Sequence, residues 1–127
     1  ADTEVLAGLE MGGIPIATAL SLHTGIPAAF VRKQAKLYGT ARLAEGCDID
    51  GRRVTVVEDV ITTGGQVVIS TNDLRALGAK VDHVLCVIDR STDKAAALTA
   101  EGLQLHSLLT CAQLDAAEAR SQTIRLG

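Results

Sequence analysis

Residues 53–65 constrain the fold and the ligand of this chain more than any other stretch. They read RVTVVEDVITTGG. The β-branched run 54–57 favours a buried strand, and two acids, Glu58 and Asp59, follow it directly. A turn of small residues, 62–65, then leads into a segment with helical periodicity.

This order of residue types is suited to an anionic, hydroxylated ligand. A helix that begins after a glycine- and hydroxyl-rich turn offers unpaired backbone N–H groups to an anion. Carboxylates accept hydrogen bonds from sugar hydroxyls and reach hydrated Mg²⁺. The alternative is a solvated acid pair at a strand end. The turn that follows favours the ligand site, because two adjacent carboxylates repel each other without a partner.

Composition restricts the class of protein. With 127 residues, 47% hydrophobic and 21% charged, the chain has the size and balance of one globular domain. A net charge of −3 gives no support for nucleic-acid binding, and no run approaches the roughly 18 apolar residues that span a membrane. The three cysteines are scattered without a CxxC pair, so we expect neither a zinc site nor disulfides, and a cytoplasmic location.

Apolar strands that alternate with helices predict a doubly wound α/β fold. We expect a mostly parallel five-stranded sheet with helices on both faces. The expected strands are residues 4–8, 28–31, 53–57, 81–88 and 103–109, and the expected helices are 14–23, 65–77, 93–100 and 112–120. Ser91 or Thr92 is expected to cap the third helix and Thr110 the fourth, with residues 121–127 as a tail or edge segment.

The predicted strand order is 2-1-3-4-5. Ligands of such sheets bind beyond the carboxyl ends of the strands, where the order switches direction. This order brings the turn after the first strand beside the turn after the third. The polar stretch 33–47, with 48–51, forms a long connection that is either a functional lid or a misassigned element, and we favour the lid.

The segment VVEDVITTGG at 56–65 resembles the phosphoribosyl-pyrophosphate (PRPP) motif of the type I phosphoribosyltransferases. Three further segments are most similar to the orotate phosphoribosyltransferases. The first is GLEMGGIP at 8–15, which resembles the pyrophosphate loop of that family. The resemblance implies a non-proline cis peptide at Leu9–Glu10 and diphosphate binding by a set of backbone N–H groups. That set is Leu9, Glu10, Met11, Gly12 and Gly13.

The second segment, FVRKQAKLYG at 30–39, is similar to the catalytic loop of the orotate enzymes. The alternative is a solvated basic turn. The resemblance implies that Arg32, Lys33 and Lys36 bind phosphate, and that Lys36 stabilises the departing pyrophosphate. Tyr38 stands where the family usually has histidine, and it carries no positive charge. The resemblance also implies a homodimer in which the loop 33–46 is shared across the interface.

The third segment, VIDR at 87–90, resembles the strand end that grips orotate. The resemblance implies that Arg90 binds the orotate carboxylate, with Thr62 nearby. The alternative for Arg90 is a salt bridge to Asp89 or Asp93.

The implied reaction transfers ribose 5-phosphate from PRPP to orotate, giving orotidine 5′-monophosphate and pyrophosphate in pyrimidine synthesis. Glu58 and Asp59 would hold the ribose hydroxyls, with Asp59 and Lys36 as the catalytic residues. Mg²⁺ would arrive with PRPP, bridged by water to the two acids rather than bound directly by protein. The residues implied to cradle the 5′-phosphate are Val60, Ile61, Thr62, Thr63, Gly64 and Gly65. Two alternatives are a PRPP- or nucleotide-binding regulatory module without turnover and a phosphoribosyltransferase for another base.

The resemblance covers residues 1–127 as a single core domain and lacks the N-terminal hood of the orotate enzymes. Either the sequence is a truncated product or a second chain supplies the missing layer. In both cases we expect one sheet face to be under-covered and to carry an apolar patch.

Overall fold

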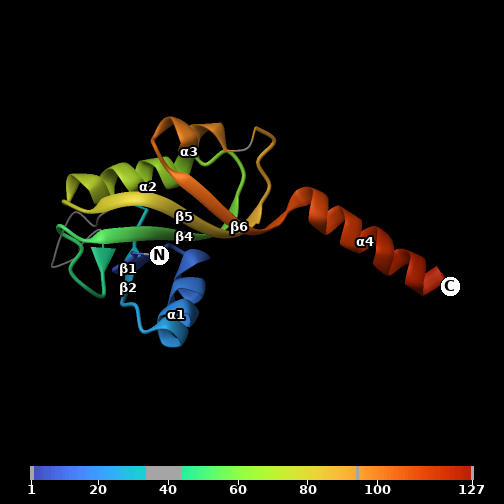
Figure 1. The fold of residues 1–127 in the computed structure, drawn as a ribbon, viewed down its shortest axis with the longest axis horizontal. Helices are drawn as coiled ribbons and strands as arrows, with labels where there is room; N and C mark the ends of the chain where they lie inside the picture. The colour runs from blue at the N-terminus through green and yellow to red at the C-terminus, as the bar shows by residue number, and fades with distance from the viewer. Residues whose placement is uncertain (1, 34–43, 94, 127) are drawn as a thin grey trace.

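The computed structural model of the protein describes residues 2–33, 44–93 and 95–126, and side chains up to residue 121. In these residues strands and helices alternate along most of the chain (Figure 1). The strands are β1 (Val5–Leu9), β2 (Ala28–Val31), β3 (Ala44–Glu45), β4 (Arg53–Ile61), β5 (Lys80–Asp89) and β6 (Gln104–Thr110). The helices are α1 (Gly13–Thr24), α2 (Gly65–Ala76), α3 (Ala96–Ala100) and α4 (Cys111–Leu126).

The sheet has the order β3-β2-β1-β4-β5-β6, and all its pairs are parallel except β2 with β3. The order of the five predicted strands is therefore confirmed. Both faces of the sheet carry helices as predicted, with α2 and α3 on one side and α1 on the other (Figure 1). The prediction missed β3, because a two-residue strand has no periodicity to detect.

The core lies mainly between the sheet and the layer formed by α2 and α3. Alternate strand residues such as Val5, Val56 and Val84 are buried there against Leu74 of α2 and Leu98 of α3. A smaller cluster packs under α1. It consists of Leu6, Ala17 and Val57 with the partly buried residues Ile16, Leu20, Ile26 and Ala28. The central strands are thus apolar on both faces, which explains their unbroken hydrophobic pattern.

Strand β4 is longer than predicted, and this places the two acids within the strand. The sequence pattern ended the strand at Val57, but pairing with β5 continues from Glu58, opposite Cys86, to Ile61, opposite Asp89. The error has a simple cause. The sequence pattern depends on side chains. The hydrogen bonds between β4 and β5 join backbone groups, so they continue past polar residues at the exposed strand end.

The third helix begins later than predicted and lacks the predicted cap. Ser91 donates both its N–H, at 2.8 Å, and its hydroxyl, at 2.6 Å, to Asp89 Oδ1 instead of capping a helix. Helix α3 begins only at Ala96, after Ala95 in the left-handed region with φ 56°. The Asp89 carboxylate therefore binds the group that would have started the helix.

The cap of the last helix is confirmed. Thr110 Oγ1 accepts the N–H of Gln113 at 3.3 Å, and Gln113 Oε1 accepts the N–H of Thr110 at 2.8 Å, which is a capping box. The helix runs to Leu126, so residues 121–126 are helical rather than a tail or edge segment. Helix α4 extends away from the rest of the fold (Figure 1).

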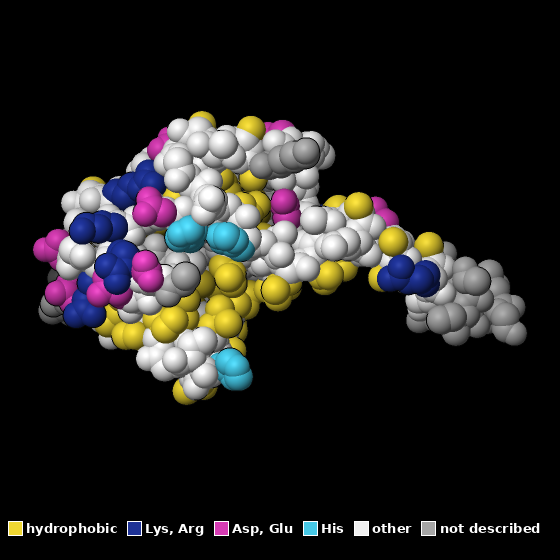
Figure 2. Space-filling model, viewed as in Figure 1, with side chains coloured by type: hydrophobic (Ala, Val, Ile, Leu, Met, Phe, Trp, Pro, Cys, Tyr) yellow, Lys and Arg dark blue, Asp and Glu magenta, His cyan; other side chains and the backbone are white. Residues whose placement is uncertain are grey.

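The face of the sheet that bears α1 is open over β5 and β6. His83, Leu85 and His106 line a hollow there, and Leu108, two residues along β6, is 69% exposed. Figure 2 shows hydrophobic side chains gathered between the paired histidines and α1. This open face matches the under-covered face that we expected. Among the described residues, no helix combines the length and the apolar character needed to cross a membrane.

Candidate functional site

The turn after β1 packs directly against the acids of β4. Strands β1 and β4 are neighbours, with Gly8 opposite Val57. A Cβ on Gly12 would collide with the Asp59 carboxylate, and one on Gly13 would collide with the Val57 carbonyl oxygen. Glycine is therefore required for this close approach. The convergence of these two segments, predicted from the strand order, is present in the structure.

The non-proline cis peptide lies one residue later than predicted. It joins Glu10 to Met11 rather than Leu9 to Glu10. The turn itself is the predicted one, since β1 ends at Leu9 and α1 begins at Gly13.

The two carboxylates fold back on the backbone that follows them. Glu58 Oε1 accepts the N–H of Asp59 at 3.0 Å, and Asp59 Oδ1 accepts the N–H of Val60 at 2.7 Å. Burial is the main cause that raises the pKa of Glu58, the neighbouring Asp59 carboxyl adds to it, and the Asp59 N–H and the Lys33 ammonium oppose it; together they place this pKa at about 7. Glu58 can therefore gain or lose a proton near neutral pH.

The turn at 62–65 presents a helix N-terminus at the same edge of the sheet. Gly64 has φ 83°, and α2 begins at Gly65 without a side-chain cap. Thr63 Oγ1 accepts the Gly65 N–H at 3.3 Å, which shapes the turn. An uncapped first turn and the helix dipole both favour an anion here. Ile61 is only 2% exposed, so it can contribute backbone but not side chain to a ligand.

Arg90 lies beside this turn. Its N–H donates to the Ile61 carbonyl oxygen at 2.8 Å, which puts it across from Thr62. Its side chain is exposed, and within the described part of the chain it makes no ion pair with Asp89 or Asp93. The salt-bridge alternative is therefore not what the structure shows. A hollow of about 510 Å³, lined in part by Asp89 and Ser107, lies next to this strand end.

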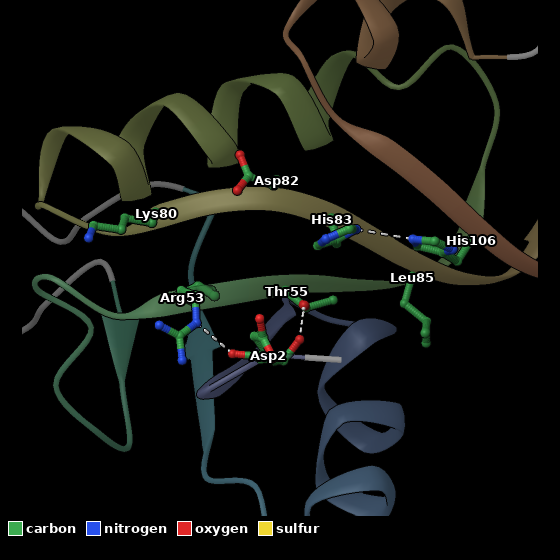
Figure 3. Close-up of a pocket in the computed structure, with 10 residues that line it drawn as sticks. Asp2, Arg53, Thr55, Lys80, Asp82, His83, Leu85 and His106 are labelled. Atoms are coloured by element: carbon green, nitrogen blue, oxygen red, sulfur yellow. Dashed lines mark hydrogen bonds between the residues drawn. The ribbon is translucent and has the colours of Figure 1, made fainter.

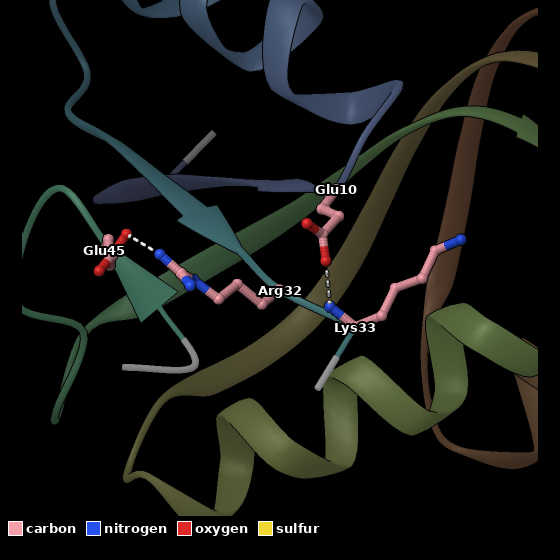
Figure 4. A network of polar contacts seen from close by, with 4 residues as sticks. All are labelled: Glu10, Arg32, Lys33 and Glu45. Carbon is pink, nitrogen blue, oxygen red and sulfur yellow. Dashed lines mark hydrogen bonds and ion pairs between the residues drawn. The ribbon is translucent and has the colours of Figure 1, made fainter. Parts of the chain in front are cut away.

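The basic residues that follow β2 point in different directions. Arg32 Nη2 lies 2.6 Å from Glu45 Oε2 of β3, whereas the Lys33 side chain extends the opposite way (Figure 4). The Lys33 N–H donates to Glu10 Oε1 at 2.8 Å. The structure thus places Lys33 near the acids and Arg32 on Glu45, and phosphate binding by either residue stays a prediction.

Two predicted residues, Lys36 and Tyr38, lie outside the described residues, as does most of the loop 33–46.

A second hollow, of about 600 Å³, lies at the opposite end of the sheet (Figure 3). Arg53 and Lys80, the first residues of β4 and β5, are among the residues that line it. His83 Nδ1 and His106 Nε2 are 3.1 Å apart in this hollow. Neither histidine belongs to a sequence motif, and only the pairing of β5 with β6 brings them together.

Candidate metal ligands are sparse in the described residues. They contain no group of three or more His, Cys, Asp or Glu side chains that could hold a metal ion. Glu58 and Asp59 offer carboxylate oxygens, which are the donors that Mg²⁺ prefers. One oxygen of each accepts a backbone N–H, so the other is left for a ligand or a water.

Comparison with known proteins assigns the fold and the motifs to a family. A family model described as the phosphoribosyl transferase domain matches residues 2–99. This chain belongs to the phosphoribosyl transferase family. Its sheet order and the acid-containing strand β4 are therefore those of a phosphoribosyl transferase core, and the resemblance noted in the sequence is confirmed.

Several similar proteins carry a more specific name. The chain is 58% identical over 115 residues to the orotate phosphoribosyltransferase of Nocardioides sp. and 42% identical over 117 residues to that of Halobacterium salinarum. These alignments cover 91% and 92% of this chain but 64% and 67% of the two relatives. The chain thus spans about two thirds of the length of the curated relatives it matches.

A solved structure shows the same likeness. The orotate phosphoribosyltransferase of Mycobacterium tuberculosis in complex with PRPP superposes with a TM-score of 0.78 at 41% identity. The match covers 89% of this phosphoribosyl transferase chain and 66% of that protein.

Proposed function

We propose that this chain carries the PRPP-binding core of an orotate phosphoribosyltransferase. The observation that carries the proposal is the packing of Gly12 against Asp59, beside the uncapped start of α2. It puts a backbone turn, two carboxylates and a helix N-terminus at one edge of the sheet. The likeness to orotate enzymes, one of them described with PRPP, supports the same ligand.

Each part of this edge suits one part of PRPP. Glu58 and Asp59 accept hydrogen bonds from the ribose hydroxyls. The backbone of 60–65 and the hydroxyls of Thr62 and Thr63 hold the 5′-phosphate at the start of α2. The backbone of 9–13 and the ammonium of Lys33 hold the pyrophosphate.

The proposed reaction displaces pyrophosphate from the ribose C1 through an oxocarbenium-like state. The nucleophile is a ring nitrogen of orotate, which gives up its N–H proton to solvent. The C1–O bond breaks as the C1–N bond forms, and pyrophosphate leaves with the bonding electron pair. Positive charge from Lys33 and Lys36 stabilises the negative charge that collects on the leaving group. Asp59 holds the ribose while positive charge develops on it.

Arg90 is the proposed orotate ligand. Its exposed guanidinium makes no ion pair in the described part of the chain, and it can bind the planar carboxylate through two parallel hydrogen bonds. Thr62 lies across from it and supplies a hydroxyl.

The proposal includes Mg²⁺ carried by PRPP. Glu58 and Asp59 would hold its hydration shell through their second carboxylate oxygens. When bound with PRPP, Mg²⁺ supplies positive charge to the diphosphate oxygens. Removal of Mg²⁺ with a chelator is expected to abolish turnover and to weaken PRPP binding in calorimetry.

The proposal also includes a homodimer in which residues 33–46 contribute to the partner's site, and a cytoplasmic location. The free state of Cys47, Cys86 and Cys111 supports a reducing compartment. Sedimentation equilibrium tests the dimer, and a monomer that turns over at full rate would contradict it.

Turnover of orotate tests the activity. With PRPP, Mg²⁺ and orotate, we expect the absorbance of orotate to fall and pyrophosphate to appear in equal amount. Absence of both turnover and PRPP binding would refute the proposal.

Tyr38, at the position of the usual histidine, favours a second candidate, a PRPP-binding module without turnover. PRPP binding without reaction of orotate or any other offered base would select it, whereas reaction of another base alone would select a different phosphoribosyltransferase.

A further inference from the structure

The turn 10–13 contains Glu10, whose negative charge would repel the pyrophosphate that the turn is proposed to bind. Leu9, Met11, Gly12 and Gly13 have uncharged side chains, as expected of a turn that binds an anion through its backbone. Glu10 carries a carboxylate into the same turn. A negative charge facing pyrophosphate would weaken binding, so this side chain needs another role.

The structure turns the Glu10 carboxylate towards the end of β2 (Figure 4). Its Oε1 accepts the Lys33 N–H at 2.8 Å. Its own N–H donates to the Val31 carbonyl oxygen, also at 2.8 Å. One residue therefore joins the turn to β2 through both its backbone and its side chain.

These two bonds extend the β1–β2 ladder beyond its last residue pair. The parallel pairing ends with Leu9 opposite Val31, because β1 then bends into the turn that leads to α1. The Lys33 N–H, two residues further along, can no longer reach a β1 carbonyl oxygen in regular register. The Glu10 carboxylate takes the place of that acceptor, and a charged acceptor forms a stronger bond than a neutral one.

The other side of the turn rests on β4. A Cβ on Gly12 would collide with Asp59, so the turn is in close contact with that acid. Glu10 therefore fixes the distance between Lys33 on one side and the acids on the other. The Lys33 ammonium is close enough to the acids to lower the pKa of Glu58 against the larger effect of burial.

We propose that Glu10 is a positioning residue. Its carboxylate accepts the Lys33 N–H and so holds the turn 10–13 and the Lys33 side chain in positions where both can bind the same diphosphate. The structural part of this inference is independent of the proposed function. Its catalytic consequence rests on that function.

Two substitutions separate geometry from charge. Glu10→Gln loses the charge but keeps an oxygen acceptor at the same reach. Glu10→Asp keeps the charge but is shorter by one methylene, about 1.5 Å, which takes the carboxylate out of hydrogen-bonding distance of the Lys33 N–H. A positioning role predicts that the Gln variant keeps its affinity for PRPP and that the Asp variant loses it. A direct role of the charge predicts the reverse.

The experiment compares Glu10→Gln, Glu10→Asp and Glu10→Ala in the intact protein, with exposed Glu118→Gln as the control. We expect the KM for PRPP to rise roughly tenfold or more in the Asp and Ala variants, with the KM for orotate unchanged. The Gln and control variants should stay within about threefold of the unaltered protein. Thermal melting checks that each variant is folded.

Amide hydrogen exchange at Lys33 provides a readout that needs no substrate. We expect faster exchange in the Asp and Ala variants and near-normal exchange in the Gln variant. Unchanged exchange in Asp and Ala would overturn the inference, and so would a Gln variant that loses PRPP affinity while Asp keeps it. If the unaltered protein turns over no orotate, the proposed function fails, and the exchange data still decide the role of Glu10.

Discussion

At the scale of single residues, the site depends on the space that the missing side chain of Gly12 leaves for the Asp59 carboxylate. Gly12 has φ −66°, a conformation that any residue adopts, so its backbone does not require glycine. The requirement comes from Asp59, which occupies the space that a side chain would fill. The sequence motif identifies the glycine, but only the structure gives this reason for it.

Gly12→Ala is therefore expected to damage the site rather than the fold. The new methyl group must displace either the turn or the Asp59 carboxylate, and we expect PRPP affinity in calorimetry to fall at least roughly tenfold.

Gly25→Ala is the matched control for the glycine substitution. A Cβ there meets open space, but φ is 79°. We expect a stability loss of about 1 kcal/mol with PRPP affinity unchanged. Equal PRPP affinities in the Gly12 and Gly25 variants would contradict the account.

Glu58 gives a second prediction at this scale. Its pKa is raised from 4.5 to about 7, so the folded protein holds the proton more tightly than the unfolded chain. This contribution to the free energy of unfolding is full below pH 4.5, decreases as the pH rises to 7, and is lost above it. We expect Glu58→Gln to remove this part of the pH dependence in urea melts between pH 4.5 and 8.

The matched control for Glu58 is Glu118→Gln on exposed α4, which should keep the pH slope of the unaltered protein. An unchanged slope in the Glu58 variant would show that the carboxyl is not perturbed as described.

At the scale of elements, the sequence predicted those with a long apolar pattern. Strand β2 and the start of α2 have the predicted bounds, and Gly25 ends α1 as expected, with its N–H bonded to Ser21. The misses occurred where tertiary contacts decide. Strand β4 continues because β5 pairs with its backbone, and α3 starts late because Asp89 binds Ser91.

The capping box of α4 makes an element-scale prediction. Thr110→Ala removes the hydroxyl that accepts the Gln113 N–H, and we expect a loss of about 1 kcal/mol in the stability of α4. Thr110→Ser keeps the hydroxyl acceptor and should retain most of the stability that the cap gives to α4. Helix content by circular dichroism and exchange of the Gln113 amide measure the effect. An Ala variant that behaves like Ser would show that the cap is not formed in solution.

At the scale of the whole molecule, the strand order was the most informative prediction. Placing the first strand between the second and the third brought 10–13 beside Asp59, two segments almost fifty residues apart. Two contacts could not be predicted, and the reason is also physical. The side-chain bond from Glu10 and the pairing of His83 with His106 depend on strand register, which a single sequence does not give.

Both turns at this edge of the sheet are proposed to bind one PRPP molecule. Titration of isotopically labelled protein with PRPP and Mg²⁺, followed by the amide resonances of residues 10–13 and 62–65, tests it directly. We expect both sets to shift together and to fit a single dissociation constant. Shifts in only one turn, or two different dissociation constants, would contradict it.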